Sequence, residues 1–303
     1  MREWWNLIMS CDANNGHRIC AGIVTYNPNA QDIIENVEEL SSQVNHIYIV
    51  DNGSKNTTFL ENISENCIII QNKDNNGLAV ALNQLVSRAE EDGYTDIFLF
   101  DQDSTVTEGF TDLLLSCAGD DVAIVCPIIK DKNKPDRGDL VKGIVEATRP
   151  ITSGGLYNIN IWSKLHGFCE DYFIELIDYD YDEKCLSAGY KILQQSSAVL
   201  LQEGGHAERT NWPCGITRGQ GRMQIKFAYR YNYSSNRYYQ RYRNYIIFLS
   251  KVKGKRKTKD EMMYMKSIIH DIIIERNHCE NIRNIIKGIR DGRAFVRKSE
   301  EHE

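Results

Sequence analysis

The sequence predicts an α/β fold in which helices cover both faces of a mostly parallel sheet. Strand-like and helix-like segments alternate through the first half of the chain, as they do in β-α-β units. Polar clusters follow three of the predicted strands, at the edge where ligands bind on such sheets. The 303 residues, 42% of them hydrophobic, are enough for one large domain and a smaller C-terminal region.

The first half contains five short apolar runs that end at turn-forming residues, which is typical of strands. These predicted strands are residues 19–25, 46–50, 67–71, 95–100 and 122–127. Apolar residues recur with the helical period between them. The predicted helices are residues 31–44, 77–91 and 108–117.

The second half is less regular. A helical turn at 162–168 is followed by an acidic stretch at 173–181 and a helix that ends near Gly189, a typical C-cap. Residues 261–289 predict one amphipathic tail with Ile and Met on one face, which could also form a homodimer interface. We divide the chain into an extension at 1–17, an α/β domain at 18–220 and a Tyr-rich basic helical region at 221–303.

The charge of the chain is unevenly distributed. The net charge of −6 argues against a general nucleic-acid binder, yet residues 222–259 hold twelve Lys or Arg and no Asp or Glu. Basic residues interleaved with tyrosines occur in single-strand binders. They also occur in proteins that lie on anionic membranes. We favour peripheral docking on a membrane, with no nucleic-acid partner.

Several protein classes are disfavoured by what the sequence lacks. The nine cysteines include no Cys-x-x-Cys pair, which favours a reducing, cytoplasmic compartment over a zinc site. No apolar run approaches the ~18 residues of a membrane-spanning helix. Neither a Gly-x-Gly-x-x-Gly nor a P-loop motif is present, which argues against dinucleotide oxidoreductases and P-loop enzymes.

The strand at 95–100 runs into Asp101-Gln102-Asp103. Side chains alternate along an extended chain, so Asp101 and Asp103 point the same way and repel each other unless a cation lies between them. Such hard oxygen ligands suit Mg²⁺ or Mn²⁺. An acidic turn before the next helix is the alternative interpretation.

A second acidic cluster places five carboxylates within residues 175–183. An acid at a helix start is stabilised by the helix dipole by ~0.3–1 kcal/mol, which explains one of these residues but not five.

Seven motifs occur in a recognisable order. They are Thr25-Tyr26-Asn27-Pro28, Asp51-Asn52-Gly53-Ser54, Asn75-Asn76-Gly77, Asp101-Gln102-Asp103-Ser104, Thr152-Ser153-Gly154, Asp178-Tyr179-Asp180, and Tyr238-Tyr239 with Arg243-Asn244. Together they resemble family 2 glycosyltransferases of the GT-A fold, most closely the bacterial rhamnosyltransferase-like branch. The resemblance covers about residues 18–248 and implies a GT-A nucleotide-diphospho-sugar transferase fold with a helical C-terminal extension.

The resemblance implies which residues bind the donor. The nucleotide base lies at the first two strand ends, and Asp51 could accept from the N3–H of uracil or thymine, although a turn held by its own Asp51 is the alternative. Backbone N–H groups at a helix start suit ribose or diphosphate oxygens. The implied donor-binding residues are Thr25, Asn27, Asp51, Asn76, Gly77, Gln102 and Arg243.

The resemblance also implies the reacting groups. Asp103 would bind Mg²⁺ or Mn²⁺ directly, Asp101 through water or the ribose, and His206 as a third ligand, although Gln202 stands where relatives carry a histidine. Asp178 is the implied general base, and Glu175 is the second candidate. The implied acceptor-side residues are Ser153, Gly154 and Asp180.

The implied activity is metal-dependent, inverting transfer of L-rhamnose from dTDP-L-rhamnose to a lipid-linked saccharide during O-antigen or capsular polysaccharide biosynthesis. The enzyme would be cytoplasmic and peripheral on the inner face of the cell membrane. A transferase for another hexose from a UDP-sugar and a non-catalytic scaffold of a polysaccharide-assembly complex are the alternatives. A nucleotidyltransferase is disfavoured because the Gly-rich loop it needs after the first strand is missing.

Overall fold

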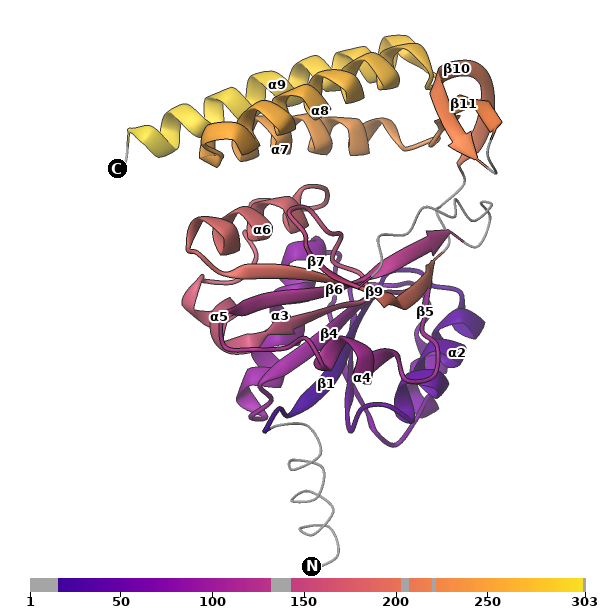
Figure 1. Ribbon diagram of the computed structural model, residues 1–303, viewed down its shortest axis with the longest axis vertical. Helices are drawn as coiled ribbons and strands as arrows, with labels where there is room; N and C mark the ends of the chain where they lie inside the picture. The colour runs from indigo at the N-terminus through magenta and orange to yellow at the C-terminus, as the bar shows by residue number, and fades with distance from the viewer. Residues whose placement is uncertain (1–15, 132–142, 203–206, 220–221, 302–303) are drawn as a thin grey trace, which may run out of the picture. The chain divides into compact units, whose positions relative to one another are not determined.

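A computed structural model describes residues 16–131, 143–202, 207–219 and 222–301. The chain divides into two compact units. The first, which we name the sheet unit, contains the described residues up to Phe173 and residues 177–202. The second, the helical unit, contains residues 174–176 and the described residues from 207 onward (Figure 1). The predicted extension at 1–17 lies almost wholly outside the described residues.

The sheet unit is built on nine strands in the order β3-β2-β1-β4-β8-β6-β9-β5, with β7 also paired to β9. They are β1 (Ile19–Thr25), β2 (Ile47–Asp51), β3 (Cys67–Gln71), β4 (Asp96–Asp101), β5 (Ser104–Thr105), β6 (Val122–Asp131), β7 (Ile144–Glu146), β8 (Gly155–Asn158) and β9 (Lys191–Gln202). The four strands β1 to β4 pair in parallel, and β8 runs antiparallel between β4 and β6. The carboxyl ends of β1, β2 and β4 therefore meet at one edge.

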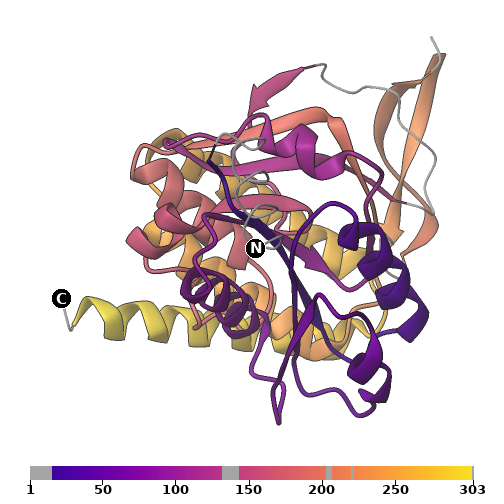
Figure 2. The ribbon, with the colours of Figure 1, turned by 90° about the horizontal axis from the view of Figure 1, so that it is seen from below.

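Helices cover both faces of this sheet. They are α2 (Ala30–Ser41), the 3-10 helix η1 (Thr58–Asn62), α3 (Leu78–Glu91), α4 (Phe110–Leu115), α5 (Ile159–Lys164) and α6 (Ile177–Ser187). Ile33 of α2 and Phe110 of α4 share one core with Ile23 of β1. The next residue toward the N-terminus, Gly22, faces Leu85 of α3, so α3 covers the opposite face (Figure 2). A Cβ at Gly22 would lie 3.0 Å from Leu85, which explains why glycine suits this close approach.

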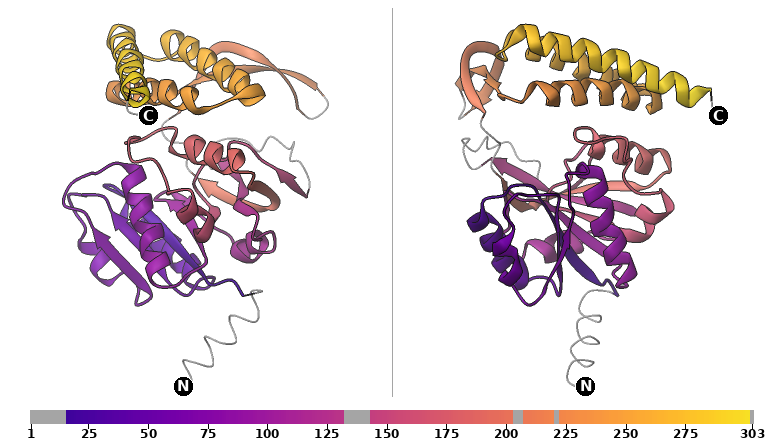
Figure 3. Two further views of the ribbon diagram at one scale, coloured as in Figure 1. Left: turned by 90° about the vertical axis from the view of Figure 1, so that its left-hand side faces the viewer. Right: turned by 180° about the vertical axis from the view of Figure 1, so that it is seen from behind.

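The helical unit consists of a β-hairpin and three helices (Figure 3). The elements are β10 (Glu208–Gly219), β11 (Arg222–Arg230), α7 (Ser235–Lys251), α8 (Gly254–Ile273) and α9 (His278–Glu300). Helices α7 and α9 approach closely because glycine replaces a side chain at their contact. A Cβ at Gly288 would lie 2.5 Å from the Tyr239 carbonyl oxygen, and one at Gly292 would lie 2.7 Å from that of Arg243.

The sequence-based elements agree with the structure except at three places. Strands 19–25 and 67–71 match β1 and β3, and the predicted helices are recovered with shorter ends. The prediction of one helix at 261–289 is wrong, because α8 ends at Ile273 and Asn277 has a left-handed φ of 60° before α9. The short strands β5, β7 and β8 and the hairpin β10–β11 were not predicted. The predicted domain boundary at 220/221 lies between Gly219, where β10 ends, and Arg222, where β11 begins.

Within the described part of the chain, no helix combines the length and the apolar character needed to cross a bilayer.

Candidate active site

Asp101 and Asp103 lie at the carboxyl end of β4, where the chain turns into β5. Strand β5 pairs antiparallel with the end of β9, which places Ser104 opposite Gln202. The Gln202 side-chain amide Nε2 donates to Asp101 Oδ2 at 2.9 Å and to Asp103 Oδ1 at 3.1 Å. The two carboxylates thus converge on one neutral donor. An oxygen-rich point of this kind fits Mg²⁺ or Mn²⁺, with room for ligands supplied by a substrate.

The turn at Asp101 is held by hydrogen bonds to the buried side chain of Ser153. The Asp101 backbone N–H donates to Ser153 Oγ at 3.1 Å, and Ser153 Oγ lies 2.6 Å from Ser104 Oγ. The next residue, Gly154, has a φ of 77° and donates to the Leu99 carbonyl at 2.7 Å. Both Ser153 and Gly154 are buried. They therefore hold the turn, and their place on the acceptor side stays a prediction.

The ends of β1 and β2 are joined by the Asp51 carboxylate. Asp51 is 1% exposed, and its Oδ1 accepts from Thr25 Oγ1 at 3.0 Å. Its Oδ2 accepts from the Ser54 backbone N–H at 3.0 Å, and Ser54 Oγ donates to Oδ1 as well. These are the contacts of a turn held by its own aspartate. Asp51 thereby links the end of β1 to the turn after β2 through Thr25 and Ser54.

A second link at this edge uses side chains that remain accessible. Gln102 Oε1 accepts from the Tyr26 backbone N–H at 2.8 Å, so it connects the end of β4 to the end of β1. Asn27 adopts a left-handed φ of 46°, donates from its N–H to Ser54 Oγ at 2.7 Å and accepts from the Lys55 N–H at 3.0 Å. The loops after β1, β2 and β4 are consequently tied together before any ligand binds.

The loop before α3 is held by asparagines. The Asn76 N–H donates to Asn52 Oδ1 at 3.1 Å, and the Gly77 N–H donates to Asn75 Oδ1 at 3.0 Å. Both N–H groups predicted to bind the donor therefore already have partners. The Asn76 side chain is exposed, and Gly77 has a φ of 91° that favours glycine.

Helix α6 carries the candidate base in an acidic environment. Asp178 is half-buried, and its Oδ1 accepts from the Tyr179 N–H at 2.9 Å. One turn later, burial raises the pKa of Asp182 well above its ordinary value, and the charge of Asp178 adds to this effect. Burial and the carboxylate of Asp178 thus both favour the neutral form of Asp182 in the folded protein.

Asp180 faces the interior. It is 1% exposed, and its Oδ1 accepts from the Tyr172 hydroxyl at 3.0 Å, while Oδ2 lies 3.9 Å from Lys184 Nζ. The place of Asp180 on the acceptor side stays a prediction.

Glu175 has a different role from Asp178, although only three residues separate them. It belongs to the helical unit, where its carboxylate pairs with Arg237 at 2.5 Å and Arg241 at 3.1 Å. Burial alone raises the pKa of Glu175, but Arg241 and Arg237 outweigh it and hold the pKa below its usual value. Asn244 Nδ2 also donates to the Ile174 and Glu175 carbonyls. These contacts hold Glu175 in a left-handed conformation with a φ of 70°.

Arg243 lies on α7 beside α9. Its guanidinium donates to Asn244 Oδ1 at 2.9 Å and lies 5.2 Å from the centre of the Phe295 ring. The predicted metal ligand His206 lies outside the described residues.

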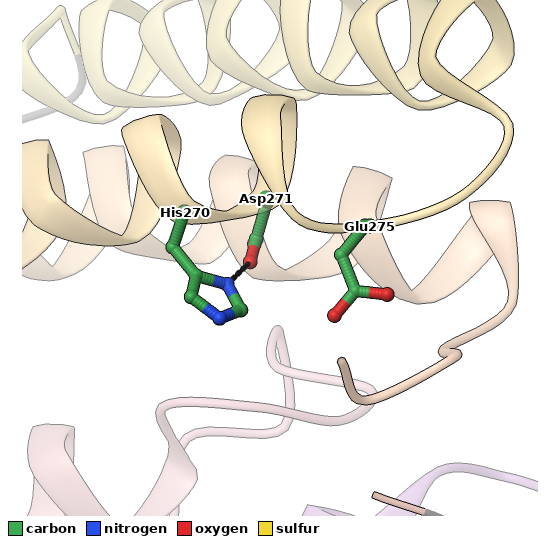
Figure 4. Close-up of side chains that lie close together, drawn as sticks. All are labelled: His270, Asp271 and Glu275. Atoms are coloured by element: carbon green, nitrogen blue, oxygen red, sulfur yellow. Dashed lines mark hydrogen bonds and ion pairs between the residues drawn. The ribbon is translucent and has the colours of Figure 1, made fainter. Parts of the chain in front are cut away.

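The helical unit contains a second group of candidate metal ligands, His270, Asp271 and Glu275, whose ligand atoms lie within 4.8 Å of one another (Figure 4). Each already has strong partners. His270 bridges Asp271 Oδ1 and the Tyr229 carbonyl, and Glu275 accepts from the Tyr231 and Asn232 N–H groups. Asp271 also accepts from Arg241 at 3.2 Å and from Tyr242 at 2.8 Å. The cluster therefore fastens β11 to α8 as a neutralised network.

Gln202 is the main site residue that was not among the predicted ones. The sequence did offer one indication, because Gln202 occupies the position at which relatives carry a histidine. The pairing of β5 with β9, which brings it to the two aspartates, did not appear in the sequence pattern.

Comparisons with known proteins agree with this geometry. Residues 20–176 match the family model described as Glycosyl transferase family 2. A dTDP-rhamnosyl transferase, RfbF of Shigella flexneri, is 27% identical over 191 residues, which is 56% of this chain and 64% of that relative. The match therefore spans less than two thirds of the relative's length.

Two solved structures have a similar fold. A crystal structure of GalNAc-T7 with UDP, GalNAc and Mn²⁺ aligns with a TM-score of 0.56 at 11% identity, over 77% of this chain and 48% of that one. A structure of S. aureus TarS aligns with a TM-score of 0.53 at 13% identity, over 86% of this chain and 44% of that one. The parallel sheet, the flanking helices and the C-terminal helices thus form a GT-A fold with a helical extension. Because the family match covers just over half of the residues, the chain belongs to glycosyl transferase family 2 and is rhamnosyltransferase-like.

Proposed function

We propose that the protein transfers L-rhamnose from dTDP-L-rhamnose, with inversion, to a lipid-linked saccharide in O-antigen or capsular polysaccharide biosynthesis. The observation that carries the transferase part is the convergence of Asp101 and Asp103 on Gln202 at the edge where β1, β2 and β4 end. The sugar and the pathway are supported by the similarity to the S. flexneri enzyme. Transfer of another hexose from a UDP-sugar is the second candidate.

We assign the metal to Asp101 and Asp103, with Mg²⁺ or Mn²⁺ as the ion. A divalent ion there would neutralise the leaving diphosphate as a Lewis acid. Gln202 lies within hydrogen-bond distance of both carboxylates and can turn its amide to present Oε1 instead of Nε2. His206 remains a proposed further ligand.

We assign the general base to Asp178. Its half-buried carboxylate lies in the first turn of α6 and can accept the proton of the attacking acceptor hydroxyl. Glu175 is the weaker candidate because both of its oxygens are engaged by arginines and its pKa is lowered. A base with a lowered pKa and two charged partners accepts a proton less readily.

The remaining predicted residues take supporting roles in this proposal. On the donor side, Asn27, Gln102 and the exposed Asn76 side chain line the nucleotide site, and Thr25, Asp51 and Gly77 shape it from beneath. Arg243 is proposed for the diphosphate. On the acceptor side, Ser153, Gly154 and Asp180 act by positioning the Asp101 turn and α6 rather than by contact.

We further propose that the protein works in the cytoplasm, peripherally on the inner face of the cell membrane. Exposed lysines at the start of α8 and exposed apolar residues along it support this arrangement. Met262, Met265, Ile269 and Ile273 are each about half exposed at helical spacing, which is typical of a helix lying in an interface. The same stripe supports a homodimer as the alternative occupant.

The deciding experiment is a transfer assay on a synthetic lipid-linked acceptor with a panel of nucleotide sugars. We expect turnover with dTDP-L-rhamnose in the presence of Mn²⁺ or Mg²⁺ and its loss with EDTA. The anomeric configuration of the product, read by NMR, should be inverted relative to the donor. Turnover with a UDP-hexose alone would select the second candidate. Nucleotide-sugar binding without turnover on any acceptor would favour a non-catalytic scaffold.

A further inference from the structure

The side of α8 that faces α7 and α9 changes character along the helix. Near its C-terminal end, Tyr264, Ile268 and Ile272 pack against a core formed by Tyr238, Tyr242 and Ile285. Four residues before Tyr264 this stripe continues at Asp260, which is 2% exposed, and the groove-lining residues of this part of α8 are Glu261 and Lys257. The apolar seam of the three helices therefore ends part-way along α8, because charged residues replace the apolar ones that would close it.

Beyond that point the three helices enclose an open groove of about 850 Å³. Its apolar side is formed by residues of α7 and α9, namely Ile246, Leu249, Ile286, Ile289 and Val296. Its charged side is formed by Lys257, Arg290, Arg293, Arg297 and Glu261. Ile286 is 61% exposed, so part of the apolar surface is open to solvent. The volume is within the ~300–1,000 Å³ of typical small-molecule sites.

The apolar side and the cationic side of the groove together indicate which kind of ligand it can bind. Apolar surface of this kind favours a hydrocarbon chain, because its burial gains roughly 25 cal/mol per Å². Arg290 is paired with Asp291 at 3.0 Å, so Lys257, Arg293 and Arg297 against Glu261 leave the rim a net charge of +2, which favours a phosphate or diphosphate. A second copy of this chain would bring its own cationic rim into contact with the first, and like charges oppose that arrangement.

We propose that this groove binds the anionic lipid that carries the acceptor saccharide, that is, an isoprenoid or acyl chain ending in a phosphate or diphosphate. The proposal deepens the proposed function and rests on it for the biological role of the lipid. The lining residues of the groove all belong to the helical unit, and none of them is a residue of the proposed Asp101 site. Lipid binding and sugar transfer are therefore distinguishable by experiment.

The test measures binding of farnesyl phosphate by isothermal titration calorimetry, below its micelle concentration. The full chain is used with EDTA, so that no metal ion can link the phosphate to the aspartates. Farnesol and inorganic phosphate are titrated separately. We expect saturable binding of farnesyl phosphate, with each of the two fragments at least tenfold weaker, because the groove recognises chain and charge together.

Two variants test the location. Arg293→Glu combined with Arg297→Glu reverses two rim charges, and both side chains are exposed, so folding should be retained. Ser250→Trp fills the groove from α7 at an exposed position. Each variant should weaken farnesyl phosphate at least tenfold. Lys266→Glu changes the charge of an exposed α8 residue outside the groove and should leave binding unchanged.

Several outcomes would overturn the proposal. Wild-type affinity in both groove variants would place the lipid elsewhere. Inorganic phosphate as tight as farnesyl phosphate would mean an anion site without lipid recognition. A concentration-dependent dimer that Ser250→Trp dissociates, seen by analytical ultracentrifugation, would assign the groove to a second copy. The affinity of the wild-type protein for dTDP in Mn²⁺ is measured in parallel. If dTDP binds and farnesyl phosphate does not, the groove proposal fails while the proposed donor site stands.

Discussion

Two acidic clusters in this protein look alike in composition and differ in their surroundings. At the end of β4, Asp101 and Asp103 share a neutral amide from Gln202. In the helical unit, Asp271 and Glu275 are matched by Arg241, by His270 and by backbone N–H groups. A carboxylate with charged partners of its own gains little from a metal ion. The comparison teaches that an acidic cluster already matched by arginine, histidine and backbone donors is explained as a structural network, whatever the number of its acids.

The largest expected effect is that of Asp103→Ala. Loss of a direct ligand should remove several kcal/mol of charge stabilisation, which corresponds to a loss of transfer of roughly a thousandfold or more. Stability without metal should hold or rise, because one of two neighbouring like charges is gone. Transfer assays and Mn²⁺ titration by EPR check both points. Asp271→Asn is the matched control and should leave Mn²⁺ affinity unchanged. Reduced Mn²⁺ binding in Asp271→Asn would instead assign the metal to the cluster in the helical unit.

Asp178→Asn should lower kcat by ~10²–10⁴-fold with near-normal donor affinity, because only the proton acceptor is lost. The amide is nearly isosteric, and most of the proposed nucleotide-binding residues lie at the ends of β1, β2 and β4 rather than on α6. Rapid-quench kinetics and calorimetric titration of dTDP-L-rhamnose separate the two effects. An active Asp178→Asn enzyme beside an inactive, folded Glu175→Gln enzyme would exchange the two assignments.

Glu175→Gln should act on stability rather than on chemistry. It leaves Arg241, whose side chain is 14% exposed, with one charged partner fewer, and removing one member of a buried pair costs about 3 kcal/mol or more. The lowered pKa of Glu175 gives the same stabilisation a pH dependence. It is present above the unfolded value of about 4.3 and is lost as the pH falls through the lower folded-state pKa. Urea unfolding measures the free energy of unfolding of Glu175→Gln and Asp178→Asn. Equal values for the two variants would contradict a structural role for Glu175.

Gln202→Leu should weaken Mn²⁺ affinity by about 10–100-fold, the usual cost of losing a residue that orients metal ligands. The substitution keeps the size of the side chain and removes both amide groups, so the aspartates lose their shared contact. Gln202→Glu, which adds a third carboxylate, should bind Mn²⁺ at least as tightly as the wild type. Equal affinities in all three proteins, measured by EPR, would exclude Gln202 from the site.

The smallest effect concerns His270. The hydrogen bond to Asp271 raises the pKa of His270, and burial partly opposes this effect. The Tyr229 carbonyl and the charge of Glu275 raise the pKa further. The resulting stabilisation is complete below the unfolded value of about 6.5 and is lost as the pH rises through the raised folded-state pKa. Urea unfolding between pH 5 and 9 should show a decline that His270→Gln flattens. An identical pH profile in the variant would assign the decline to another group.

Much of the sheet unit follows from local sequence patterns. The seven residues of β1 are all buried, and their unbroken apolar character is what a strand covered on both faces requires. Turn chemistry at Asp51-Asn52-Gly53-Ser54 and Asp101-Gln102-Asp103 marked the strand ends correctly within a residue or two. The break between α8 and α9 escaped prediction because it depends on the left-handed Asn277 rather than on a proline or glycine.

By itself, the sequence determined the alternation of strands and helices and the edge at which polar residues gather, since periodicity and turn propensity are local properties. Only the tertiary structure decided the partners. Gln202 reaches Asp101 across 101 positions through the β5–β9 register, and Glu175 meets Arg241 across 66. Such contacts depend on how distant elements pack, and local propensity carries no information about that. The tertiary contacts also assign Asp178 to the sheet unit and Glu175 to the helical unit, although only three residues separate them in the sequence.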